Sequence, residues 1–160
     1  MPSEGLLVGI ATIAVAVAGF TAVTSTLVPP TGSWSPAMRI RQRAIVSTSF
    51  NVVFEALAPL VAFALVNDER SALVGASAIV AMYATWVVIY RYRQILRAGG
   101  YRSVAGLILF IAGPTAMLLF WANALVLASA GVFALALCSQ LLVAVVSFYT
   151  LVSAANGGEG

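Results

Sequence analysis

The stretch that decides the fold is residues 104–155, VAGLILFIAGPTAMLLFWANALVLASAGVFALALCSQLLVAVVSFYTLVSAA, which contains no charged residue. Because about 20 apolar residues span the hydrocarbon core of a bilayer as a helix, a stretch of about fifty must cross it twice. We expect the reversal near residues 123–131, since Trp121 is typical of the membrane interface and Asn123 of a turn. The C-terminal third of the chain is therefore predicted to form two transmembrane helices.

The rest of the chain follows the same pattern. Of its 160 residues, 62% are hydrophobic and only 8% are charged, whereas soluble domains average about 25% charged residues. The N-terminal apolar run has no basic n-region and is too long for the h-region of a signal peptide, so it is expected to remain as a transmembrane helix. The sequence predicts one all-α transmembrane domain over residues 1–160, a bundle of five helices near residues 5–28, 36–66, 72–97, 103–123 and 131–154.

Seven of the eight basic residues fall in two of the predicted loops and the adjoining helix ends, on the same side of the membrane. They are Arg39, Arg41, Arg43, Arg91, Arg93, Arg97 and Arg102. Because arginine is retained on the cytoplasmic side, we expect the N-terminus outside and the C-terminus inside a bacterial cytoplasmic (inner) membrane. These arginines act as orientation anchors, or in addition attract anionic lipid.

The residue types that are missing exclude most site chemistry. The chain has no histidine, no lysine and a single cysteine, Cys138. Transition-metal sites, histidine-ligated haem, Schiff bases and Ser-His-Asp systems lack the groups they need. We therefore predict no cofactor, no metal site, no catalytic residue and no enzyme activity. The net charge is +3, but the basic residues lie in short segments between apolar runs. This distribution indicates membrane topology rather than nucleic-acid binding. The expected partner is therefore the lipid bilayer.

One polar stripe interrupts the second helix. The stripe starts at Ser47 or Thr48 and continues through Asn51, Glu55 and Pro59 at steps of three or four residues, which places it on one helical face. A charged carboxylate at the depth of Glu55 costs a few kcal/mol, so such residues face the bundle interior or a wet cavity. Pro59 lacks the donor that would bond the carbonyl of Glu55, which leaves an acceptor free one turn away.

Three readings of Glu55 stay open. It is a protonated structural acid hydrogen-bonded across the bundle, or an acid that handles protons or cations along a pathway, or part of an interface with another protein. In the structural reading its partner is one of Asn123, Gln140, Ser139 and Thr85. The candidate intramembrane polar site is accordingly Glu55, Asn51, Thr48, Ser47 and Gln140.

The first helix is rich in small residues, which let helix backbones approach closely in lipid. Gly5 and Gly9 form a Gly-x-x-x-Gly pair, and one face carries Ala11, Ala14, Ala18, Ala22 and Ser25. Such a helix packs inside the bundle or forms a subunit interface, and we expect a homo-oligomer or an assembly with other membrane subunits. The predicted function is a small non-enzymatic membrane subunit, scaffold or sensor. The alternative is an oligomeric channel or transporter-like protein that handles protons or cations through Glu55.

Four short motifs within the first two helices carry a resemblance: Ala18-Gly19-Phe20, Ser33-Trp34-Ser35-Pro36, Arg39-Ile40-Arg41 and residues 53–60. They resemble a group of small bacterial polytopic membrane proteins that have a glycine-aromatic pair in the first helix and a Trp-Ser-Pro start to the second. In that group the acid lies a turn or two earlier, nearer the position of Ser47. The resemblance implies the topology, and it implies no activity.

Overall fold

The computed structural model describes residues 1–27, 36–97 and 104–155. Its helices are α1 (Glu4–Leu27), α2 (Pro36–Val66), α3 (Glu69–Arg97), α4 (Val104–Ala122) and α5 (Ala130–Ala155), with a π-helical turn η1 (Asn123–Leu127) between α4 and α5. All five α-helices are long and apolar enough to cross a membrane. The predicted all-α polytopic bundle of five helices is thus confirmed, and over the described ranges the chain contains no strand.

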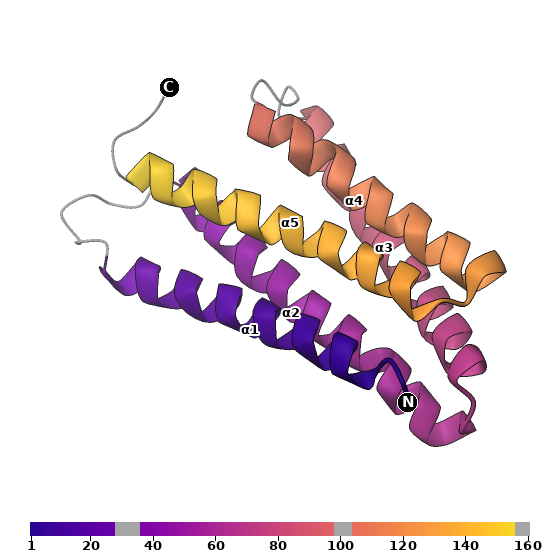
Figure 1. The fold of residues 1–160 in the computed structure, drawn as a ribbon. Coiled ribbons are helices and arrows are strands. Elements are labelled where there is room, and N and C mark those ends of the chain that lie inside the picture. The colour runs from indigo at the N-terminus through magenta and orange to yellow at the C-terminus, as the bar shows by residue number, and fades with distance from the viewer. Residues whose placement is uncertain (28–35, 98–103, 156–160) are drawn as a thin grey trace.

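The helices form a bundle with α2 and α5 at its centre. α1 contacts α2 and α5, whereas α3 and α4 lie on the other side of the central pair, as Figure 1 shows. One end of the bundle, here called the turn end, holds the N-terminus, the α2–α3 turn and η1. The opposite end, the arginine end, holds the start of α2 and the end of α3, whose sequences carry the arginines there.

The turn between α2 and α3 is only two residues long and is fixed by hydrogen bonds. Asn67 has a left-handed φ of 52°, and its N–H donates to the carbonyl of Phe63 at 2.8 Å. Asp68 Oδ2 accepts from the N–H of Ser71 at 2.8 Å, which is an N-cap for α3. Because of this cap, α3 begins at Glu69, earlier than the expected residue 72. Ser3 Oγ donates to Glu69 Oε1 at 2.7 Å and so joins α1 to this turn.

The reversal between α4 and α5 lies within the expected residues 123–131 and is organised by one buried amide. Asn123 is 0% exposed, and its Nδ2 donates to Ser77 Oγ at 2.8 Å. Its Oδ1 accepts from the N–H of Ser129 at 2.7 Å, and its carbonyl accepts from Ala128, which has a left-handed φ of 46°. Asn123 therefore closes the turn and attaches it to α3.

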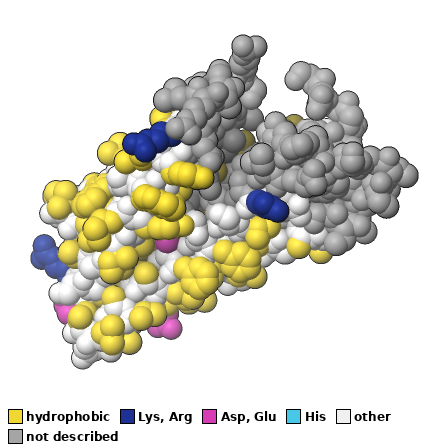
Figure 2. Space-filling model, turned by 180° about the vertical axis from the view of Figure 1, so that it is seen from behind, with side chains coloured by type: hydrophobic (Ala, Val, Ile, Leu, Met, Phe, Trp, Pro, Cys, Tyr) yellow, Lys and Arg dark blue, Asp and Glu magenta, His cyan; other side chains and the backbone are white. Residues whose placement is uncertain are grey.

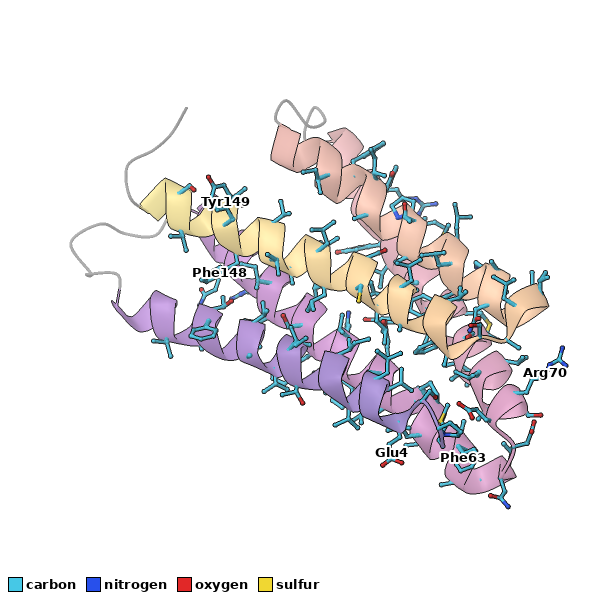
Figure 3. The ribbon with its side chains drawn as sticks, in the orientation of Figure 1. Glu4, Phe63, Arg70, Phe148 and Tyr149 are labelled. Carbon is cyan, nitrogen blue, oxygen red and sulfur yellow. The ribbon has the colours of Figure 1, made fainter. Side chains whose placement is uncertain are left out.

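The apolar core is concentrated at the turn end. Its main cluster takes residues 7–14 of α1, 52–56 of α2, 73–84 of α3, 116–120 of α4 and 133–137 of α5. Phe120 and Phe133 lie in it edge to face, with ring centroids 5.1 Å apart. The arginine-end half has a smaller described cluster, in which Phe148 of α5 lies on the side of α1 and α2 (Figure 3). The described surface is largely apolar as well (Figure 2), as a lipid-facing surface must be.

Candidate functional site

A pocket of about 60 Å³ opens between α2, α3, α4 and α5. Because a water needs about 10–15 Å³ of such space, the pocket has room for several water molecules. Its polar lining residues come mainly from α2 and α5, and its apolar ones mainly from α3. They are Thr48, Asn51, Glu55, Tyr83, Ala84, Val87, Val88, Gly113, Gln140 and Val143.

Glu55 is the only acidic residue of the pocket lining. It lies at the middle of the apolar span Ile45–Val66, about 15 Å from either end at 1.5 Å per residue, and is 6% exposed. The Gln140 side chain lies next to its carboxyl group in the pocket lining. Its Oε2 atom is buried and has no hydrogen-bond partner among the described residues. An unsatisfied buried polar atom costs about 1–3 kcal/mol, and the pocket that Glu55 lines has room for a water or a small ion that could satisfy it.

The α2 side of the pocket is built by helical spacing. Thr48, Asn51 and Glu55 follow at steps of three and four residues, so their side chains share the face that looks onto α3 and α5. The structure brings together four of the five residues of the predicted polar site, which are Thr48, Asn51, Glu55 and Gln140. Ser47 is the exception, because its side chain is exposed and lies outside the pocket lining. Because each residue turns the helix by about 100°, the side chain of Ser47 points to a different side from that of Thr48.

Of the four partners considered for Glu55, only Gln140 lies next to it in the pocket. Asn123 is occupied at the α4–α5 turn, and Thr85 Oγ1 accepts from Trp121 Nε1 at 3.0 Å. Ser139 Oγ donates to the carbonyl of Leu135 in its own helix. Gln140 is level with Glu55 because α2 and α5 run in opposite directions and each residue lies near the middle of the apolar span of its helix.

The pocket is placed asymmetrically between the two ends of the bundle. Counted along the helices, Thr48, Asn51, Val87 and Val143 all lie on the arginine-end side of Glu55. On the turn-end side the apolar cluster with Phe120 and Phe133 fills the bundle. The free space next to Glu55 therefore extends toward the arginine end.

Tyr83 is a pocket residue that the sequence did not single out. It belongs to a row of aromatic rings on α3 that continues through Trp86 to Tyr90. The ring centroids are 6.3 Å apart for Tyr83 and Trp86 and 5.9 Å apart for the stacked Trp86 and Tyr90. The spacing of three and four residues was visible in the sequence, but which ring faces the pocket depends on how α3 packs against α2.

All but one of the predicted basic anchors lie within the described helices. Arg43 and Arg93 are exposed near the arginine end. The helical ranges of α2 and α3 include Arg39, Arg41, Arg91 and Arg97, whereas Arg102 lies outside the described residues. Of the two anchors whose side chains are described, Arg43 and Arg93, neither lines the pocket.

The chemistry available in the pocket is that of one carboxyl group surrounded by neutral polar groups. Asn51 and Gln140 each offer an oxygen acceptor and an NH₂ donor, so they can bind water or complete the coordination of a cation. No group of three or more His, Cys, Asp or Glu side chains that could hold a metal ion occurs among the described residues. Comparison of the chain with protein-family models, with curated proteins and with solved structures finds no match.

Proposed function

We propose that this multi-pass membrane protein is transporter-like and that Glu55 binds and releases a proton or a small cation within the α2–α5 pocket. The observation that carries the proposal is the state of Glu55: its buried Oε2 has no hydrogen-bond partner among the described residues, and the residue lines a pocket with room for water. A purely structural acid would account for the neighbouring Gln140. It would not account for the second oxygen or for the space beside it.

The position of the pocket supports a direction of access. If the arginine end is cytoplasmic, as the retention of basic residues on that side predicts, Glu55 is reached from the cytoplasm. The packed Phe120 and Phe133 close the opposite side. Transport then requires a second arrangement in which this apolar cluster opens and the arginine-end half closes, as in alternating access.

The test is proton flux in liposomes. The purified protein is reconstituted with a pH-sensitive dye inside, and a potassium gradient with valinomycin drives protons inward. We expect flux above that of empty liposomes, and Glu55→Gln should abolish it because the amide cannot release a proton. Glu4→Gln is the matched control, because Glu4 is an exposed acid at the turn end, far from the pocket (Figure 3). Equal flux for wild type and Glu55→Gln would rule out the proposal.

Assembly into an oligomer is a second proposal, favoured by the outer face of α1. An added Cβ atom at Gly5, Gly9 or Gly19 would meet nothing within 4 Å. The same helix uses Ala11, Ala14 and Ala18 to pack against the bundle. The glycine face is therefore not needed inside the chain, and close backbone approach of a second copy is the use that such faces have in lipid.

A further inference from the structure

The aromatic row of α3 is largely exposed on the surface of the bundle. Tyr83, Trp86 and Tyr90 are 41%, 63% and 54% exposed. Tyr90 is the last residue of the apolar span Glu69–Tyr90, where the hydrocarbon meets the headgroup layer. Tyr83 lies about 10 Å deeper along the helix and forms part of the pocket wall. The row thus connects the headgroup layer at the arginine end with the pocket of Glu55.

The pocket combines one acidic group with apolar and aromatic walls. Among the described residues of its lining there is no lysine or arginine, and Glu55 is the one that can carry a charge near neutral pH. Ala84, Val87 and Val88 of α3 supply the opposite wall. A strongly hydrated metal ion gains nothing from such a wall, and an anion is repelled by Glu55. A cation that carries apolar substituents satisfies both parts of the lining.

The size of the pocket and the geometry of its aromatic ring narrow the class of cation further. A pocket of about 60 Å³ holds about four to six waters at 10–15 Å³ each, which corresponds to a group of about four to six heavy atoms. An ammonium nitrogen with three or four methyl substituents has this size. Its diffuse positive charge is attracted to the face of an aromatic ring within about 6 Å of the centroid, and quaternary ammonium groups are commonly recognised in this way.

We propose that the pocket binds a methylated ammonium group, with Glu55 as counter-ion and Tyr83 as the aromatic wall, and that this group enters from the headgroup layer along Tyr90 and Trp86. The assignment rests on the proposed function, since it names the cation that Glu55 takes. The source of the group is a free ammonium compound or the choline headgroup of a lipid, and the two share this chemistry.

The experiment is calorimetric titration of the full chain in bilayer discs of phosphatidylglycerol, which contain no choline. Choline is compared with 3,3-dimethylbutan-1-ol, a neutral molecule of the same shape. We expect choline to bind at least about tenfold more tightly, because only the charged molecule neutralises Glu55 and meets the ring electrostatically. Glu55→Gln should remove this preference. Equal binding of the two molecules, or no binding of either, would overturn the proposal.

Variants of Tyr83 separate a binding role from a structural one. Tyr83→Ala should weaken choline binding by about threefold to thirtyfold, whereas Tyr83→Phe keeps the ring and should restore it. Tyr149→Ala is the matched control, since Tyr149 is an exposed tyrosine of α5 whose side chain points away from the bundle (Figure 3). If Glu55→Gln fails to fold, the Tyr83 pair still decides the question. Choline affinity that is the same in Tyr83→Ala as in wild type would contradict the proposal.

Two further results show which of the two proposals has failed and whether the ammonium group comes from a lipid or from a free compound. Flux that depends on Glu55, without any preference for choline, would leave the proposed function standing and remove the ammonium assignment. Choline binding without flux in any variant would remove the transport function instead. A soluble short-chain phosphatidylcholine that binds more tightly than choline assigns the group to a lipid headgroup, and the reverse order assigns it to a free ammonium compound.

Discussion

At the scale of single residues, the buried amide of Asn123 has a larger role in the fold than the carboxyl group of Glu55. It makes two side-chain hydrogen bonds, one to Ser77 and one from Ser129. Without it, the fully buried Ser77 hydroxyl would lose its donor and the partly buried N–H of Ser129 would lose its acceptor. Asn123 thus determines where α4 ends and how the reversal attaches to α3.

We expect Asn123→Ala to lower the free energy of unfolding by about 1–3 kcal/mol, because the Ser77 hydroxyl is left buried without its donor. The measurement is unfolding in mixed micelles with increasing denaturing detergent. Asn67→Gly is the control, since glycine adopts the left-handed φ of 52° at the α2–α3 turn without strain and should change stability little. Equal stability of the two variants would mean that the bonds of Asn123 are not formed.

The cap at Asp68 gives a residue-scale prediction about pH. Hydrogen bonds from the side chain and backbone of Ser71 lower the pKa of Asp68 below its ordinary 3.8. A lowered folded-state pKa stabilises the protein above the ordinary pKa, and the gain is lost as pH falls through the folded-state value. Asp68→Asn keeps a capping oxygen and removes the charge. The melting temperature of wild type should exceed that of the variant near pH 7, and the difference should be lost as the pH falls below 3.8 and through the lowered folded-state pKa.

At the scale of elements, α1 has two faces made of similar small residues with opposite roles. Ala14 is fully buried against the bundle, whereas the backbone at Gly9 borders open space. Sequence spacing does not distinguish the two faces, because both repeat small residues at helical intervals.

Leucine substitutions on α1 test this division. Ala14→Leu should overpack the core and lower the free energy of unfolding by about 1–3 kcal/mol. Gly9→Leu should leave the monomer's stability unchanged and reduce the fraction of cross-linked dimers in lipid, since bulk at this site keeps two backbones apart. Val15→Leu, which adds bulk at another exposed position of α1, is the control for cross-linking. Unchanged cross-linking in Gly9→Leu would contradict the assembly proposal.

At the scale of the whole molecule, apolar side chains pack the turn-end half of the bundle, and the polar pocket extends into the arginine-end half. The main apolar cluster occupies the turn-end half. Thr48 and Asn51 continue from Glu55 toward the arginine end. This asymmetry is what the proposed transport function requires of a state that is open to one side.

Accessibility to a charged thiol reagent tests the asymmetry. Cys138 is first replaced by serine, which leaves the chain without a thiol. Asn51→Cys in this background should react with a membrane-impermeant reagent applied from the arginine-end side only, because the pocket extends that way. Ala76→Cys, buried in the turn-end cluster, is the control and should react from neither side. Labelling of Asn51→Cys from the turn-end side would show that the access route is wrongly assigned.

The sequence was sufficient to predict the five helices that are long and apolar enough to cross a membrane, and the position of each residue along them. Apolar runs separated by charges and turn formers fix the number of helices, because bilayer thickness sets the length of each run. Pro36 marks the start of α2, as expected for proline at a first helical position. From that start the register alone places Glu55 at mid-membrane and puts Thr48 and Asn51 on its face.

Only the tertiary structure decided which faces meet. It selected Gln140 from four candidate partners of Glu55, excluded Ser47 from the pocket and added Tyr83 to it. In water, a polar outer face identifies the buried face of a helix, but lipid is as apolar as a neighbouring helix. Large apolar side chains such as Phe54 and Leu137 therefore lie outside and inside the bundle respectively. Without a polarity contrast, helix orientation follows from the packing of all five helices together, and no single helix sequence contains it.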